Sequence, residues 1–176
     1  TRGLGLLTRK KMIYACNVDD VDLAAGNAMV DAVRATAAAE GARIVIVSAQ
    51  VESELPELTH EEKREFLESL GVKEDMCGLR ALVRETYELL GLQTYFTSGE
   101  TETRAWTIQS GWTAPQAAGV IHSDFERGFI RAETIAYDDL VASGSEKAAK
   151  EKGLVRSEGK EYVVKEGDVI LFRFNV

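Results

Sequence analysis

The feature that most constrains the fold is a helical pattern enclosed by two short apolar segments. The segments are KMIYAC, at residues 11–16, and RIVIVSA, at residues 43–49. Such β-branched, nearly uninterrupted apolar runs are typical of buried strands. Between them, residues 28–40 repeat apolar side chains at helical spacing among alanines, and Gly41 supplies a helix stop. The pattern predicts a βαβ unit with two parallel strands and a right-handed crossover.

Two polar loops follow these strands, and in a parallel pair both emerge at the edge where open α/β sheets bind ligands. The first loop is NVDD, at residues 17–20, and the second is SAQ, at residues 48–50. An Asn three residues before a carboxylate resembles the base-reading NKxD motif of G-type nucleotide domains, with Val18 in place of the Lys. Taken alone, such a pair is more often a loop cap. The candidate nucleotide-binding residues are Asn17, Val18, Asp20, Ser48, Ala49 and Gln50.

Two further helices are predicted before a domain boundary at Gly91. After a linker at Pro56, Thr59 and Glu62 have the spacing of a capping box, which starts a helix that runs through Leu70. Apolar residues then repeat at helical spacing from Leu79 to Leu90 and predict a second helix with one apolar face. We expect a first domain at residues 1–90 and a second at residues 91–176.

The second domain has the pattern of a small α+β fold. Short helices are predicted to begin at Thr113, with Pro115 in the first turn, and at Ser145. We expect them to pack on a single face of a sheet. The segments predicted as strands are LQTYFT, TRAWTI, GFIRAETIAY, EYVV and DVILFRFNV. The fold class is therefore α/β followed by α+β.

Composition limits the classes of partner. The chain has 21 Lys and Arg against 29 Asp and Glu, a net charge of −8, so long-range attraction to phosphates does not organise it. Its apolar runs are too short for a membrane span. Cys16 and Cys77 form neither a disulfide framework nor a zinc pattern, and we expect both to be reduced. We expect a cytoplasmic monomer without a membrane partner, and the first residues, TRGLGLL, look like the end of a helix in a fragment.

Catalytic residues are not indicated. His60 and His122 lack a nucleophile or a metal-ligand partner at a telling spacing, so we expect solvated or hydrogen-bonded imidazoles. The pair Asp138 and Asp139 is better explained as the start of a surface helix than as a metal site. The phosphate-binding pattern GxxxxGK[S/T] does not occur in the sequence. We therefore expect neither a catalytic nor a metal site in this chain.

Six segments carry a family resemblance that spans nearly the whole chain. They are LQTYF at 92–96, RAWTI at 104–108, APQAAG at 114–119, IHSDFERGFI at 121–130, YDD at 137–139 and FRFNV at 172–176. With them the chain resembles the YchF or EngD family of Obg-like ATPases. The resemblance implies that residues 1–90 are the C-terminal portion of a P-loop G-type domain. It also implies that residues 91–176 are a TGS domain with a β-grasp fold.

The resemblance also implies a nucleotide. In this family the base-reading motif is N-x-x-E and ATP is favoured over GTP. By similarity, Asn17 and the backbone of Val18 would contact adenine, while residues 48–50 would close the other side of the base. Asp20 stands where the family has Glu, and the shorter carboxylate could restore some tolerance of guanine. The parent protein would hydrolyse ATP with Mg²⁺ held by parts absent here, and this chain alone would be inactive. The alternative is a GTP-preferring nucleotide-binding protein.

Relatives in this family are associated with ribosomes, which implies a ribosome or RNA partner. Residues 91–176 hold ten Lys and Arg against thirteen Asp and Glu, so any RNA contact must be local. We expect a contact from Trp112, Arg127 and Arg131, in which the indole stacks on a base, whereas Trp106 is expected in the core. The lysines Lys147, Lys150 and Lys152 form either a basic patch or a solvated helix face.

Two other descriptions of the second domain stay open. The chain as it stands could be a non-enzymatic TGS module that binds RNA or ribosomes. The TGS half could also be an internal partner that docks on the nucleotide domain. Salt dependence separates phosphate contacts from apolar docking, because only the former weaken steeply as salt is raised.

Overall fold

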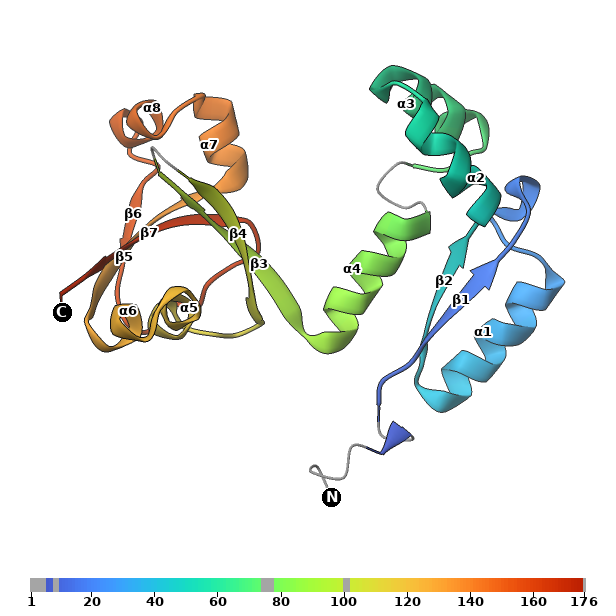
Figure 1. Cartoon of the computed structure of the whole chain (residues 1–176), viewed down its shortest axis with the longest axis horizontal. Helices are drawn as coiled ribbons and strands as arrows, with labels where there is room; N and C mark the ends of the chain where they lie inside the picture. The colour runs from blue at the N-terminus through green and yellow to red at the C-terminus, as the bar shows by residue number, and fades with distance from the viewer. Residues whose placement is uncertain (1–5, 8–9, 74–77, 100–101, 176) are drawn as a thin grey trace. The chain divides into compact units, whose positions relative to one another are not determined.

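The computed structural model of the chain describes residues 6–7, 10–73, 78–99 and 102–175 (Figure 1). The chain divides into two compact units, Thr1–Leu90 and Gly91–Val176. The first five residues of TRGLGLL, the segment expected to end a helix, lie outside the described residues. Cys77 lies outside them as well. Within the described residues, no helix is both long and apolar enough to cross a membrane.

The first unit is built on the predicted βαβ element. Strands β1 (Ile13–Asn17) and β2 (Arg43–Val47) pair in parallel, with Asn17 opposite Val47 at the end of the ladder. Helix α1 (Ala28–Glu40) connects them. The Asn27 side chain caps α1 by accepting hydrogen bonds from two backbone N–H groups, and Gly41 ends it with a φ of 66°. The prediction of parallel strands is confirmed.

The described residues of the first unit form further helices and 3₁₀ turns after the βαβ element. The predicted capping box is confirmed, because the backbone N–H of Thr59 donates to the Glu62 carboxylate over 2.8 Å. A linker was expected around Pro56. The structure instead has a helix at residues 49–54, which the Ser48 side chain caps, followed by a 3₁₀ turn that contains Pro56. The elements are η3 (Asp20–Asp22), α2 (Ala49–Glu54), η4 (Leu55–Glu57), α3 (His60–Ser69) and α4 (Gly78–Leu90).

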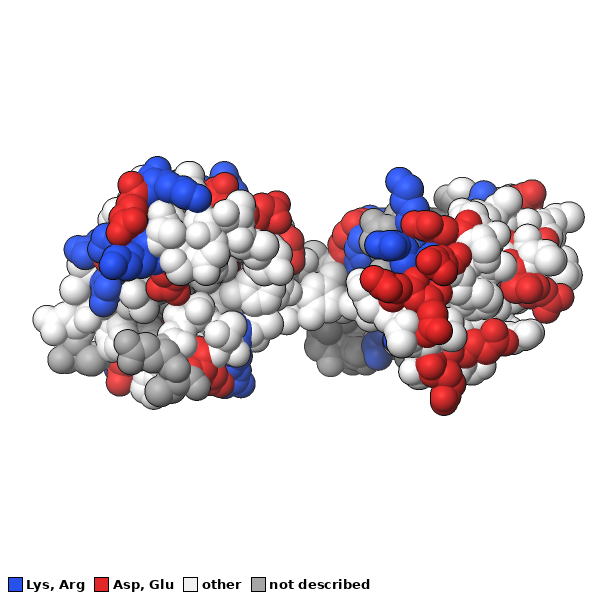
Figure 2. Space-filling view, turned by 90° about the horizontal axis from the view of Figure 1, so that it is seen from above, with Lys and Arg blue, Asp and Glu red and all other residues white. Residues whose placement is uncertain are grey.

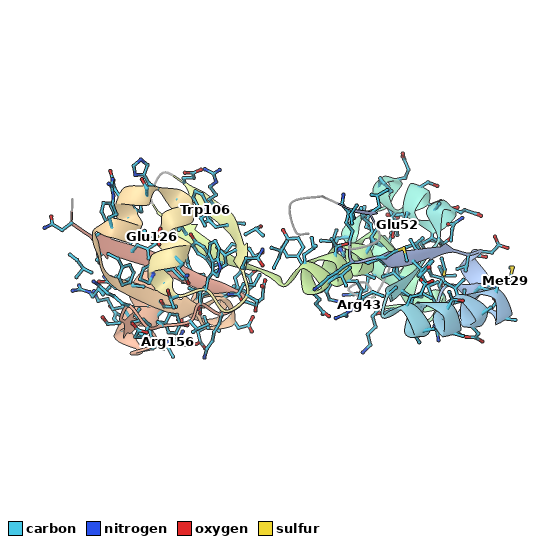
Figure 3. The ribbon with its side chains drawn as sticks, turned by 90° about the horizontal axis from the view of Figure 1, so that it is seen from below. Met29, Arg43, Glu52, Trp106, Glu126 and Arg156 are labelled. Carbon is cyan, nitrogen blue, oxygen red and sulfur yellow. The ribbon has the colours of Figure 1, made fainter. Side chains whose placement is uncertain are left out.

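Helix α4 is tied to β2 by charge as well as by packing. The Arg43 guanidinium bridges the carboxylates of Glu85 and Glu88 at 2.8 and 2.9 Å. Glu52, labelled with Arg43 in Figure 3, accepts a hydrogen bond from the Leu79 N–H at the start of α4. The predicted helix is confirmed, and Leu79, Val83 and Leu90 on its apolar repeat are 50–60% exposed. Helical spacing predicts the helix but not which side meets the sheet.

The second unit contains one five-stranded sheet in the order β4-β3-β7-β5-β6. Strands β3 and β7 pair in parallel, and the other neighbours pair antiparallel. The strands are β3 (Leu92–Ser98), β4 (Thr103–Gln109), β5 (Phe129–Ala136), β6 (Arg156–Glu158) and β7 (Asp168–Phe174).

Helices lie on both sides of this sheet (Figure 1), so the expectation of a single covered face is wrong. Helices α5 (Ala114–Ile121) and α6 (Ser123–Arg127) lie on one side, and α7 (Tyr137–Ser143) and α8 (Glu146–Glu151) lie on the other. The core cluster joins α5 to the sheet. At its centre Tyr95 meets Phe172 edge to face at 5.8 Å and donates its hydroxyl hydrogen to the Ala117 carbonyl over 2.9 Å.

The predicted strand EYVV is also wrong. This segment pairs with the loop before α5, where the backbone N–H of Ala114 donates to the Tyr162 carbonyl and that of Val164 to the Trp112 carbonyl. Only an isolated bridge between Thr113 and Val163 has β character. The sheet is instead completed by β6, which pairs with β5 and was not predicted.

Candidate nucleotide-binding edge

The carboxyl ends of β1 and β2 are joined by the side chain of Asn17. Its Oδ1 accepts a hydrogen bond of 2.9 Å from the backbone N–H of Ala49. The N–H of Val18 donates to the Val47 carbonyl, also over 2.9 Å. The two predicted loops therefore lie side by side, and we call residues 17–20 and 48–50 the β1–β2 edge.

The second loop is rigid because it is the start of a helix. Ser48 is 1% exposed, and its hydroxyl oxygen accepts a hydrogen bond from the Val51 N–H at 3.4 Å. Ala49 and Gln50 are exposed in the first turn of α2, where Gln50 donates to the Glu54 carboxylate at 3.4 Å. Ser48 thus acts through its cap, whereas Ala49 and Gln50 present surface to a ligand.

In the first loop, Val18 and Asp20 have different surroundings. Val18 is half-buried against the apolar cluster that contains Leu23 and Val51, so its backbone is held in place. Asp20 is exposed, and its Oδ1 accepts a hydrogen bond of 2.8 Å from the Val21 N–H at the start of a 3₁₀ turn. Asp20 therefore has a local backbone contact within its own loop, and its side chain is exposed.

A cavity of about 290 Å³ adjoins the edge between β1 and α1. Asn17 and Val18 line it together with Asn27, whose amide donates to the Asp22 carboxylate over 2.7 Å. Sequence reasoning missed Asn27, although an Asn directly before a helical pattern is an N-cap signal. The half-buried thiol of Cys16 is also in the lining.

Both histidines lie at the starts of helices. His60 is the first residue of α3. The Nδ1 of His122 accepts a hydrogen bond of 3.2 Å from the Asp124 N–H and caps α6, which matches the expected hydrogen-bonded imidazole. Across the described ranges, which omit residues 74–77 and 100–101, no three His, Cys, Asp or Glu side chains are placed to hold a metal ion.

The structure gives the surroundings of the three residues expected to contact RNA. Trp112 is half-buried and packs against the core cluster, because the loop before α5 is tied to residues 162–164. Arg127 pairs with Asp124, and this ion pair lowers the pKa of the Asp124 carboxyl. Arg131 pairs with Glu133 at 3.1 Å. In the part of the chain that is described, no hydrogen bond, ion pair or ring contact joins the three residues.

Trp106 lies where it was expected, against the core. Its indole packs on the core cluster and its Nε1–H donates to the Thr97 hydroxyl over 2.9 Å. The Arg104 guanidinium covers the ring at 4.2 Å from its centre (Figure 3 labels Trp106).

Glu133 makes the second unit sensitive to acid. Hydrogen bonds from Arg173 and Arg131 lower the pKa of its carboxyl. A lowered native pKa stabilises the fold above the unfolded pKa, and this stabilisation is lost as the pH falls through the native pKa. In Glu133→Gln we expect the free energy of unfolding to vary less with pH below about pH 4.5. Urea titrations at several pH values measure this, with the exposed Glu161→Gln as control. An unchanged pH dependence in Glu133→Gln would contradict the assignment.

Comparison with known proteins shows what the whole chain is similar to. The family model YchF-GTPase_C, described as a protein of unknown function (DUF933), matches residues 92–175. The "Ribosome-binding ATPase YchF" of Bacillus subtilis is 57% identical over 175 residues, which are 98% of this chain and 47% of that protein. "Obg-like ATPase 1" of Rattus norvegicus is 39% identical over 173 residues, 97% of this chain and 43% of that protein. The chain thus spans about half the length of these relatives.

Solved structures agree with these sequence matches. The Schizosaccharomyces pombe YchF GTPase superposes with a TM-score of 0.74 at 35% identity, over 93% of this chain and 43% of that one. A GTP-binding protein from Pyrococcus horikoshii OT3 superposes with a TM-score of 0.61 at 18% identity, over 93% of this chain and 46% of that one. Because the second structure is only 18% identical in sequence, its similarity supports the fold and no other property.

Proposed function

The chain belongs to the YchF family of Obg-like ATPases, and from this premise we propose that it supplies the purine-reading edge of a ribosome-associated ATPase together with a TGS domain. The observation that carries the proposal is the hydrogen bond between Asn17 and Ala49, which joins the two loops at one end of the sheet. A relative of this kind is named a ribosome-binding ATPase, and the chain matches it along 98% of its own length.

The edge suits a purine ring because it combines a fixed amide with exposed backbone. The Asn17 Oδ1 is held by Ala49, so the amide NH₂ of the same side chain is directed and available to donate to purine N7. Val18 and the first turn of α2 then lie on the two sides of the base. Adenine has no N1–H for a carboxylate to accept, so Asp20 adds little to ATP binding. We propose that ATP is bound in preference and that Asp20 leaves GTP as a weaker ligand.

We infer that phosphate binding and hydrolysis depend on the part of the relatives that this chain does not match. The sequence has no GxxxxGK[S/T] loop. The described residues likewise hold no cluster of His, Cys, Asp or Glu that could bind Mg²⁺. Positioning of phosphates and Mg²⁺ is nearly all of the catalysis in such enzymes. This chain therefore contributes affinity and base selectivity rather than catalytic groups.

The second unit is proposed as a β-grasp TGS domain that engages the ribosome in the cytoplasm. Support comes from the parallel pairing of β3 with β7 at the middle of the sheet, with α5 packed across its core face. The ribosome-binding name of several relatives supports the partner.

Photolabelling tests the proposed edge. A chimaera in which this chain replaces the matching residues of the Bacillus subtilis relative is irradiated with 8-azido-ATP and digested with trypsin. We expect labelled peptides that begin at Met12 and at Ile44, because these contain residues 17–20 and 48–50. Excess ATP should abolish both labels. Labelling confined to other peptides would contradict the proposal.

A further inference from the structure

The second unit carries a pocket on the side of its sheet opposite the α5 core. Its cavity volume is about 310 Å³, near the lower end of the range for sites that hold small molecules. Residues from α8 form one wall and the outward-facing side chains of β5 and β7 form the floor. We call it the α8 pocket, and its lining is Ser98, Glu133, Ile135, Glu146, Lys147, Lys150, Val155, Val169, Ile170, Leu171 and Arg173.

The pocket combines an apolar floor with cations at its rim. Leu171, which is 43% exposed, gives the floor an accessible aliphatic side chain, whereas Ile135 is buried at 5% exposure. Lys147 and Lys150 are three residues apart on α8, so they share one helix face. Neither ammonium group has an ion-pair or hydrogen-bond partner among the described residues. Two unpaired cations therefore stand beside an apolar surface.

The cationic character extends beyond the pocket. Glu133 is shared by Arg173, at 3.2 Å, and by Arg131, at 3.1 Å, so this cluster keeps a net positive charge. Figure 2 shows Lys and Arg side chains on this unit with Asp and Glu side chains among them, and residues 91–176 are acidic in total. The surface can therefore attract phosphate only at close range.

We propose that the α8 pocket binds a nucleotide of single-stranded RNA. The base lies on Leu171, its N–H groups donate to the Glu146 carboxylate, and the flanking phosphates lie against Lys147 and Lys150. A splayed base fits a concave site, whereas duplex RNA offers no free base to enter it. An acidic peptide fits less well, because its carboxylate side chains have no flat apolar face to lie on Leu171, and only its backbone N–H groups could donate to Glu146. This inference rests on the proposed ribosome association and names the contact surface for it.

Fluorescence anisotropy with a labelled single-stranded ribo-oligonucleotide tests the pocket in the full chain. We expect Lys147→Glu/Lys150→Glu to lower the affinity by at least about tenfold, because two phosphate contacts become repulsive. Lys147→Ala should reduce the slope of log affinity against log salt by about 0.7, the value for one contact to a single strand. Leu171→Ser should weaken binding several-fold and leave that slope unchanged. The matched control is Lys160→Glu, outside the pocket lining, which should bind like the unmodified chain.

Three results would overturn the proposal. The first is equal affinity of Lys147→Glu/Lys150→Glu and Lys160→Glu. The second is displacement of the oligonucleotide by equimolar UMP, which would identify free nucleotide as the ligand. The third is displacement by an equimolar Glu-rich peptide, which would identify an acidic protein segment. Ribosome co-sedimentation of the unmodified chain tests the ribosome association separately from the pocket. If the chain does not co-sediment with ribosomes, the ribosome association is contradicted, while oligonucleotide binding still tests the pocket.

Discussion

Replacing Gly128 by alanine is expected to destabilise the second unit by about 3 kcal/mol, the upper part of the usual range for overpacking. A Cβ atom at this position would lie 2.0 Å from the carbonyl oxygen of Asn175 and 2.8 Å from its carbonyl carbon. Both are backbone atoms, so no side-chain rotation relieves the clash. The Asn175 N–H also donates to the Gly128 carbonyl over 2.9 Å, so separating the two segments breaks a hydrogen bond.

Urea unfolding followed by tryptophan fluorescence measures this effect. Trp106 and Trp112 are the only tryptophans and both lie in the second unit, so the signal reports that unit alone. Gly159→Ala is the matched control, because a Cβ at Gly159 would meet no atom within 4 Å. Its free energy of unfolding should stay within about 0.5 kcal/mol of the unmodified value. Equal unfolding midpoints for the two variants would contradict the close approach of Gly128 and Asn175.

Replacing Asn17 by alanine is expected to lower the ATP affinity of the chimaera by at least about tenfold, which corresponds to about 1.4 kcal/mol. Two contributions add: the amide NH₂ can no longer donate to the base, and the Ala49 N–H loses its acceptor. Asn17→Asp separates them. An aspartate still accepts the hydrogen bond from Ala49, but it has no NH₂ to donate to purine N7.

We therefore expect Asn17→Asp to bind ATP nearly as weakly as Asn17→Ala, as measured by titration calorimetry. Thr36→Ala is the control, since Thr36 is exposed on α1 and its hydroxyl only donates to the Ala32 carbonyl. If Asn17→Asp binds as tightly as the unmodified protein, Asn17 serves only to position the loop.

Sequence predicts the features of this fold that depend on local chemistry. The βαβ unit and both ends of α1 follow from spacing, alanine content and Gly41, and the start of α3 follows from the capping box. The rest depends on tertiary contacts. The EYVV segment has strand composition but pairs with the loop before α5, and α4 has a clear apolar period yet leaves Leu79, Val83 and Leu90 exposed.

The candidate sites also differ in whether local sequence or tertiary contacts determine them. The meeting of Asn17 with the Ser48 loop could be predicted, because parallel strands end at one edge whatever surrounds them. The partners of Trp112, Arg127 and Arg131 could not be predicted, since the packing of the indole on the core and the pairing of each arginine with a carboxylate depend on tertiary contacts. The α8 pocket depends on a helix folding back over β5 and β7, which spacing does not reveal.

Titration calorimetry of the chimaera with ATP and with GTP, side by side, measures whether the β1–β2 edge binds a purine base through Asn17 and prefers adenine. We expect tighter binding of ATP than of GTP, with both weakened by Asn17→Ala. Tighter binding of GTP, or affinities for both nucleotides that Asn17→Ala leaves unchanged, would contradict this expectation.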